Sequence, residues 1–145
     1  MNPLEILKQE HQQIERELLE LETIMEELDI NYPNLIHVWK NLHDLWNSHE
    51  EKEEKIFPIM EKERIRIPVQ KMLFEHKELK KHKQEINKAI MSGSNEDIKT
   101  ALEIHGKIII GKLKEHINME DEILYTIAQE EFTKEELKEL VESLN

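Results

Sequence analysis

Residues 3–28 read PLEILKQEHQQIERELLELETIMEEL, and apolar side chains recur along this stretch every three or four positions. That spacing places them on one face of an α-helix, and Pro3 suits the first turn of such a helix. The predicted face consists of Leu4, Leu7, His11, Ile14, Leu18, Leu21, Met25 and Leu28. The stretch therefore predicts a long amphipathic helix with a histidine in the middle of its buried stripe.

The same period organises the rest of the chain. Breaker segments interrupt it at residues 29–33, 64–68 and 92–94, which leaves room for three further long helices. A capping box at residues 133–136 then opens a short last helix. Because short connections join long helices, we expect an all-α fold, namely an antiparallel up-down-up-down four-helix bundle with a short C-terminal fifth helix.

Length and composition fit one helical domain. The chain has 145 residues, of which 36% are charged and 5% aromatic, and it contains three glycines. This profile is more typical of helices than of sheets. We expect residues 1–130 to form the bundle and residues 131–145 to form a short helix packed on it or extending from it.

Charge and cysteine content exclude several classes of function. The net charge of −12 argues against a nucleic acid or an anionic membrane surface as partner. No apolar run approaches the roughly 20 residues that cross a bilayer, and the N-terminus lacks the features of a signal peptide, so we expect a cytoplasmic protein. The absence of cysteine excludes disulfides, thiolate nucleophiles and iron–sulfur clusters.

One pattern occurs twice along the chain. A Glu-His pair is followed about forty residues later by a histidine that has a glutamate four positions on. The two copies are Glu10-His11 with His49 and Glu53, and Glu75-His76 with His116 and Glu120. In antiparallel helices that rise about 1.5 Å per residue, the four histidines reach similar heights in the core.

Each downstream glutamate should follow its histidine inward, since a residue four positions on lies on nearly the same helix face. On the last long helix this face continues from Glu120 to Ile123. Buried carboxylates need a cation, and the core stripes offer few basic residues to supply one. Imidazoles with carboxylates that can bridge suit a pair of first-row metal ions, and we expect iron. The alternative is a structural bundle whose hydrogen-bonded histidines bind no metal.

At these residues the chain resembles the hemerythrin-like family, also called HHE cation-binding domains. The shared features are a histidine on each of four helices, with a carboxylate after the second and the fourth. The resemblance implies a non-haem di-iron centre bridged by Glu53 and Glu120 and by an oxo or hydroxo group. It further implies dioxygen, or a related small diatomic or peroxide ligand, as the partner of that centre.

Two positions depart from the oxygen-carrying members of this family. These members have a second histidine on the third helix, where this chain has Lys80, and their last carboxylate stands at the position of Asp121. Glu120 instead has the spacing of the iron-sensing and iron-centre-repair branches. Glu50 is a further candidate ligand, because a glutamate directly after the second-helix histidine binds metal in the iron-sensing branch. The alternative for Glu50 is a solvated helix face.

Two classes of function follow. The favoured one is a module that binds or senses dioxygen, nitric oxide or iron, and the alternative is a di-iron enzyme of peroxidase, oxidase or iron-centre-repair type. Tyr125 is a candidate hydrogen-bond donor or redox group near the centre. Lys83 lies close to the inner stripe of the third helix and is expected to reach solvent. His105 faces inward but lies too far along its helix to join the other histidines.

Overall fold

The computed structural model describes residues 2–62 and 69–142, and within them the chain is helical with short connections and no β-strand. The long helices are interrupted by two π-helical turns, labelled η1 and η2. In chain order the elements are α1 (Pro3–Met25), α2 (Tyr32–Lys62), α3 (Val69–Ser92), α4 (Asn95–Ala101), η1 (Leu102–Gly106), α5 (Lys107–Met119), η2 (Glu120–Leu124), α6 (Tyr125–Glu131) and α7 (Lys134–Glu142). The predicted connection at residues 64–68 lies outside the described residues.

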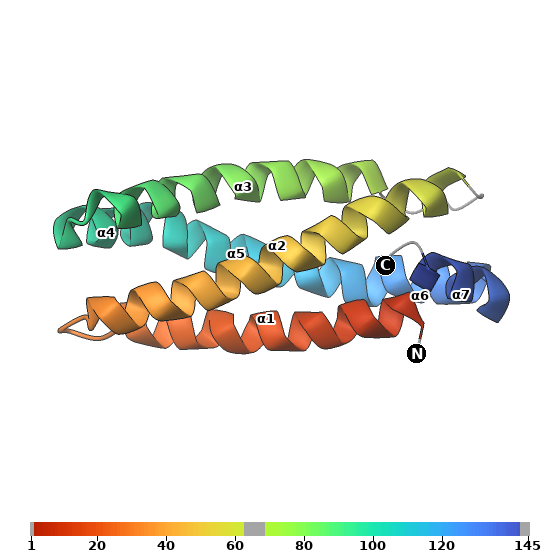
Figure 1. The fold of residues 1–145 in the computed structure, drawn as a ribbon, viewed down its shortest axis with the longest axis horizontal. Helices are drawn as coiled ribbons and strands as arrows, with labels where there is room; N and C mark the ends of the chain where they lie inside the picture. Colours follow the sequence, from red (N-terminus) through yellow and green to blue (C-terminus); the bar gives the residue numbers. More distant parts are fainter. Residues whose placement is uncertain (1, 63–68, 143–145) are drawn as a thin grey trace.

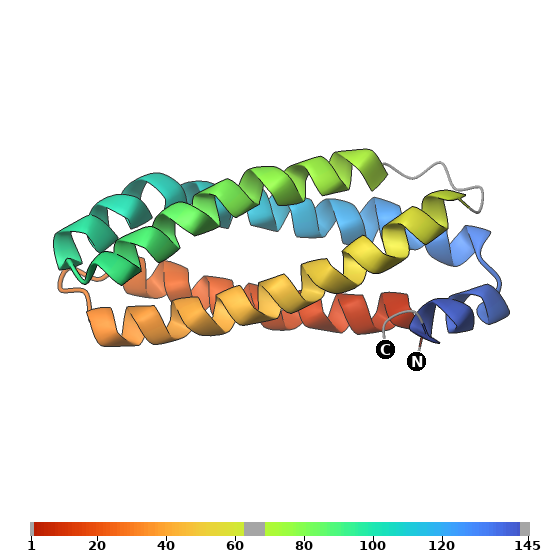
Figure 2. The same cartoon turned by 45° about the horizontal axis from the view of Figure 1, so that its top comes forward.

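Four long helices run side by side in alternating directions, the fourth being the continuous run from α4 to α6 (Figure 1, Figure 2). α1 contacts α2, α2 contacts α3, α3 contacts α5, and α5 contacts α1, which closes the bundle. α7 folds back and packs against α1. The predicted all-α bundle with a short fifth helix is confirmed. No helix in the described ranges is long and apolar enough to cross a membrane.

Side-chain caps determine where the helices begin. At the start of α1, Asn2 and Glu5 exchange side-chain and backbone hydrogen bonds in a capping box. The Asn31 side chain accepts from the Asn34 backbone N–H at 3.2 Å. α2 therefore begins before Pro33, inside the segment expected to break the helix, because proline has no N–H to leave unpaired in a first turn.

α1 ends earlier than its apolar stripe predicts. The Glu26 backbone N–H still bonds to the Glu22 carbonyl, but the Glu27 N–H bonds to the Ile24 carbonyl, and the chain then leaves the helix. Leu28 is consequently fully exposed, so the prediction that it faces the core is wrong. The apolar stripe predicts the helix correctly, but the turn after α1 determines at which residue the helix ends.

The turn η2 also corrects the predicted inner face of the fourth long helix. A π turn replaces i→i+4 hydrogen bonds with i→i+5 bonds, so the buried face continues four and five positions on instead of three. Ile123, predicted to face inward, is 46% exposed, whereas Leu124 and Tyr125 are fully buried. This change of register begins at Glu120, the first residue of η2.

Two apolar clusters fill the bundle, one towards each end. Trp39 belongs to the cluster nearest the α1–α2 turn, and Phe57 belongs to the cluster nearest α7. Leu7 and Ile14, which flank His11 on the same stripe, belong to different clusters. A buried polar layer, which contains His11, therefore lies between the two clusters at the middle of the bundle.

We predict that Gly93→Ala lowers the free energy of unfolding by about 1 kcal/mol, because Gly93 ends α3 with a φ of 74°, where a Cβ is strained. Gly111→Ala is the matched control. Gly111 lies inside α5 with nothing within 4 Å of an added Cβ. Alanine there should raise the unfolding free energy by roughly 0.5–1 kcal/mol. Urea unfolding followed by circular dichroism measures both, and equal effects would contradict this account.

Candidate metal centre

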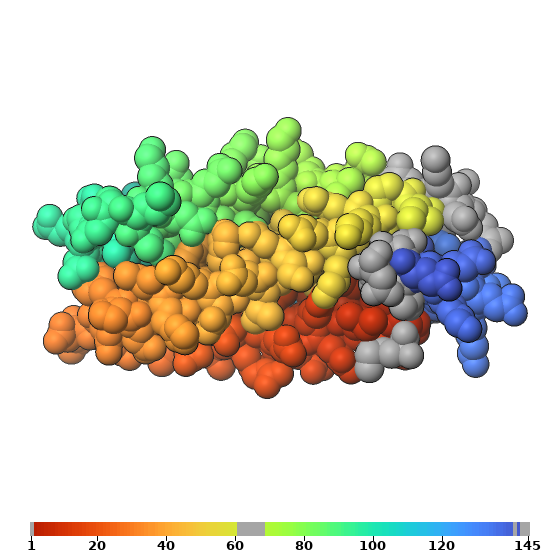
Figure 3. All heavy atoms as spheres, viewed as in Figure 1, coloured from red at the N-terminus to blue at the C-terminus, as the bar shows by residue number. Residues whose placement is uncertain are grey.

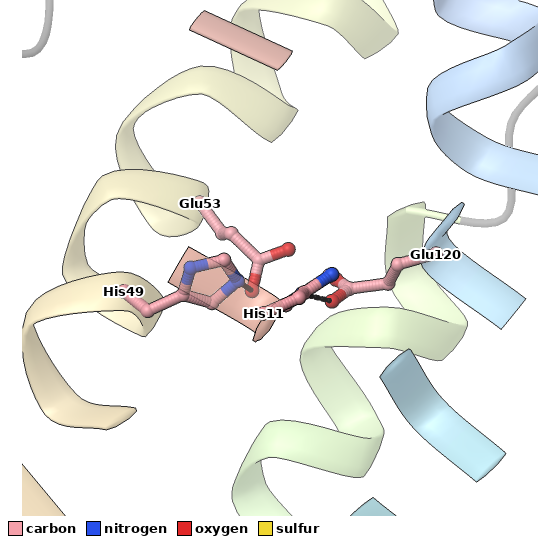
Figure 4. Close-up of side chains that lie close together, drawn as sticks. All are labelled: His11, His49, Glu53 and Glu120. Atoms are coloured by element: carbon pink, nitrogen blue, oxygen red, sulfur yellow. Dashed lines mark hydrogen bonds and ion pairs between the residues drawn. The ribbon is translucent and has the colours of Figure 1, made fainter. Parts of the chain in front are cut away.

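The structure brings six of the predicted site residues together in the polar layer, and all six are buried. They are His11 on α1, His49 and Glu53 on α2, His76 on α3, His116 on α5, and Glu120 at the start of η2. Figure 4 shows four of them, His11 from α1, His49 and Glu53 from α2, and Glu120 from η2, pointing towards one another. The similar heights expected for the four histidines are thus present in the folded chain.

Two groups of potential ligands overlap in this layer. His11 and His49 form one group with Glu53 and Glu120, and the second histidine pair, on α3 and α5, forms another group with the same two glutamates. Within each group, one ligand atom per residue lies within 4.8 Å of all the others. Two carboxylates common to two histidine pairs could hold two cations side by side, since a carboxylate can span neighbouring ions.

The Nε2 atoms of the histidines face the shared carboxylates. Each glutamate lies between the histidine four residues before it and a histidine of another helix. The distances are 3.2 Å from His49 and 3.3 Å from His76 to Glu53, and 3.4 Å from His116 and 3.0 Å from His11 to Glu120.

The glutamate of each Glu-His pair contacts a histidine on the next long helix. Glu10 Oε1 lies 3.0 Å from His49 Nδ1, and Glu75 Oε2 lies 2.5 Å from His116 Nδ1. A carboxylate on Nδ1 fixes the ring and keeps Nε2 free to bind metal. The repeated Glu-His pair was the sequence signal for these contacts, although only the fold shows which histidine each glutamate reaches.

The other two histidines differ from each other. His11 Nδ1 lies 2.8 Å from Asp121 Oδ1, so Asp121 orients His11 from outside the two ligand groups. The corresponding Nδ1 of His76 lies 3.8 Å from Glu54 Oε1, too far for a hydrogen bond, and has no partner. The two halves of the layer therefore repeat one pattern, but the Nδ1 atom of this histidine has a partner in only one of them.

The shared glutamates have opposite pKa shifts. Burial and the negative charge of Glu53 raise the pKa of Glu120 well above its usual range. Burial also acts to raise the pKa of Glu53. The charge of His49 and the hydrogen bonds that Glu53 makes outweigh this effect and hold the pKa of Glu53 well below its usual range. Burial opposes the charging of His49, yet Glu53 and Glu10 together raise its pKa to about 9. Protons thus balance charge in this layer, and a cation would displace them on binding.

Unpartnered polar atoms test whether the layer fits a metal. His49 Nε2, Glu53 Oε1 and Glu120 Oε2 are buried without a hydrogen-bond partner, although each lies close to a neighbour in its group. Leaving such atoms unpaired in a core costs about 1–3 kcal/mol each. Imidazole nitrogens and carboxylate oxygens are ligands of first-row metal ions, so the cluster fits a metal site.

Tyr125 contacts this layer directly. Its hydroxyl donates a hydrogen bond to Glu53 Oε2 at 3.0 Å, and its ring stacks on His11. Burial, followed by the negative charge of Glu53, raises the pKa of Tyr125 well above its usual range, so the phenol keeps its proton. The expected role of Tyr125 as a hydrogen-bond donor is confirmed.

Glu50 and Lys83 are both buried, contrary to the alternatives considered for them. Glu50 is 8% exposed, so the interpretation as a solvated helix face is wrong. Lys83 does not reach solvent: Nζ donates to Asn47 Oδ1 at 2.8 Å, lies 3.7 Å from Glu50 Oε2, and sits over the Trp46 ring. Burial lowers the pKa of Lys83, and Glu50 opposes this shift.

The remaining histidines take part in other contacts. His105 Nδ1 lies 3.0 Å from His82 Nδ1, and His43 interacts with Asn47 and Asn87. Within residues 2–62 and 69–142, no group of three or more potential ligands contains any of these histidines. Lys80 is exposed on α3.

A four-helix bundle with a buried layer of histidines and carboxylates defines a class of metal-binding helical proteins. The model of the hemerythrin HHE cation binding domain matches residues 2–128, and the chain belongs to this family. The match includes all six residues of the two ligand groups. Neither curated proteins nor solved structures gave a match.

We predict that Glu10→Gln weakens cation binding by roughly 10- to 100-fold, because it removes the negative charge that orients His49. Glu15→Gln is the matched control, since it makes the same change at an exposed position of α1. Competition with a chelator under anaerobic conditions measures both affinities for ferrous iron. Equal affinities in the two variants would refute the role of Glu10.

Proposed function

We propose that this protein is a non-haem di-iron protein that binds or senses dioxygen at the polar layer, with nitric oxide or iron itself as the alternative signals. One observation carries the proposal: two histidine pairs share two fully buried glutamates. This arrangement suits two cations a few Å apart. Membership of a cation-binding family supports metal binding, and the mixed imidazole and carboxylate donors suit iron.

The proposed ligands divide between the two cation positions. Glu53 and Glu120 would hold both cations, because both belong to both groups, and Glu50 would be a further metal ligand beside His76, with which it shares a third ligand group outside these two. The terminal histidine ligands in this proposal are His11, His49, His76 and His116.

Two iron ions with an oxo or hydroxo bridge would supply electrons and an open coordination position for a small ligand. The chain's own residues prepare the site for this chemistry. Glu10 and Glu75 orient the histidines of the neighbouring helices, and Tyr125 donates a hydrogen bond to Glu53. The apolar clusters towards the two ends of the bundle keep water from reaching the layer along the bundle axis.

Tyr125 also favours the second candidate function, a di-iron enzyme of peroxidase, oxidase or iron-centre-repair type. Its phenol lies one hydrogen bond from Glu53, so it could pass a proton or an electron to the centre. A binding protein does not require such a group. Replacement of Tyr125 by Phe should spare ligand binding but reduce turnover.

We predict that His49→Ala and Glu53→Ala reduce bound iron and lower the melting temperature together, since metal binding is coupled to folding when the ligands come from several helices. His105→Ala is the control, because His105 pairs with His82 and belongs to neither ligand group. Elemental analysis and thermal unfolding with and without iron measure both effects. Unchanged iron content in both ligand variants would defeat the proposed ligand set.

The iron content and visible spectrum of freshly purified protein separate the two functions. A binding protein should contain two irons per chain and form a coloured adduct with dioxygen that disappears when the gas is removed. An enzyme should instead turn over hydrogen peroxide or lose iron. A protein that contains no metal and takes up no ferrous iron would be a structural bundle.

A further inference from the structure

The two halves of the polar layer differ at positions that the duplicated pattern makes equivalent. The residue after His49 is Glu50, whereas the residue after His116 is Ile117, which belongs to an apolar cluster. Seven residues after His76 stands Lys83, whereas seven residues after His11 stands Leu18, in the same apolar cluster. The side of the layer formed by α1 and α5 therefore has apolar residues at these positions, and the side formed by α2 and α3 has a buried charged pair.

A cavity reaches the layer from this charged side. It has a volume of about 680 Å³ and lies in the seam between α2 and α3. Figure 3 shows α2 crossing this face of the molecule between α1 and α3. The cavity lining includes the exposed side chain of Glu54, the buried Glu50 and the buried His76. The cavity therefore gives solvent access to potential ligands, from Glu54 at the exposed side to His76, which also belongs to one of the two core ligand groups.

These three residues form a potential ligand group of their own. One ligand atom from each of Glu50, Glu54 and His76 lies within 4.8 Å of the other two. Glu50 Oε1 and His76 Nδ1 are buried without a hydrogen-bond partner, and the two residues are 8% and 3% exposed. On the side of α1 and α5, the equivalent nitrogen, Nδ1 of His11, already contacts Asp121. The unpartnered atoms are therefore specific to the side that carries the cavity.

We infer that Glu50, Glu54 and His76 form a third site for a divalent first-row cation, a loading site through which metal reaches the two positions of the core. This inference rests on the proposed metal-binding function and adds the route by which the centre is filled. His76 belongs both to this group and to the second core ligand group, since its Nδ1 lies near Glu54 and its Nε2 faces Glu53. A cation that leaves this site therefore has to move only from one edge of the same imidazole ring to the other.

Lys83 lowers the affinity of the loading site for a cation, and a site that passes cations on must bind them weakly. Its ammonium group lies 3.7 Å from Glu50 Oε2 and competes with a cation for that carboxylate. When the site holds no cation, Lys83 balances the charge of Glu50, which would otherwise be costly to bury. A cation therefore binds for a short time and moves on to the core, where each position offers two imidazoles and two fully buried carboxylates.

Uptake of Co²⁺ tests the inference, since Co²⁺ accepts the same imidazole and carboxylate donors. Metal-free protein is mixed anaerobically with Co²⁺, uptake is followed by visible absorption, and bound metal is counted after desalting. Glu54→Gln should slow uptake about threefold or more, because it removes a carboxylate ligand of the loading site, while the final count stays at two. Glu51→Gln is the control, since Glu51 lines the same cavity outside the ligand group.

A second variant changes binding in the opposite direction. Lys83→Met removes the competing ammonium but keeps an apolar side chain over Trp46, so a third Co²⁺ should become detectable in equilibrium titrations. The inference is overturned if Glu54→Gln takes up Co²⁺ as fast as Glu51→Gln, or if Lys83→Met binds no third cation. Wild-type protein that binds no Co²⁺ at all would overturn the proposed metal-binding function as well.

Discussion

Two fully buried carboxylates, Glu53 and Glu120, set the constraint on which the rest of the structure depends. Charge of this kind cannot be left uncompensated in an apolar core. Four imidazoles surround the pair, and Tyr125 donates a further hydrogen bond to Glu53. The bundle separates its apolar core into two clusters to make room for this layer. The helices supply the stability that allows a polar site to exist at mid-length.

One kind of contact occurs twice in the layer: a glutamate on one helix orients a histidine on the next long helix. Glu10 on α1 orients His49 on α2, and Glu75 on α3 orients His116 on α5. No helix completes a ligand group alone, so the donors converge only when the bundle has assembled. This arrangement couples folding to cation binding more closely than a site formed within one loop would do.

Residues that depart from the repeat make the two sides of the centre different. On the side of α1 and α5, Leu18 and Ile117 are apolar, whereas on the side of α2 and α3, Glu50 and Lys83 are charged and line a cavity. Tyr125, from the cluster near α7, contacts Glu53 through Oε2, whereas His49 and His76 lie near Oε1. A centre that a cavity reaches between α2 and α3 can admit cations or small ligands from that side.

The sequence by itself determined the helices and the set of buried histidines and glutamates, because helical periodicity is a local property that places residues on a face wherever the helix packs. It did not determine where Leu28 or Ile123 would lie, since a helix end and a π turn depend on how neighbouring segments pack. Nor did it show that Glu10 reaches a histidine of another helix, or that Lys83 is buried beside Glu50. Those contacts join residues far apart in the chain, and only the tertiary structure brings them within range of electrostatic interaction.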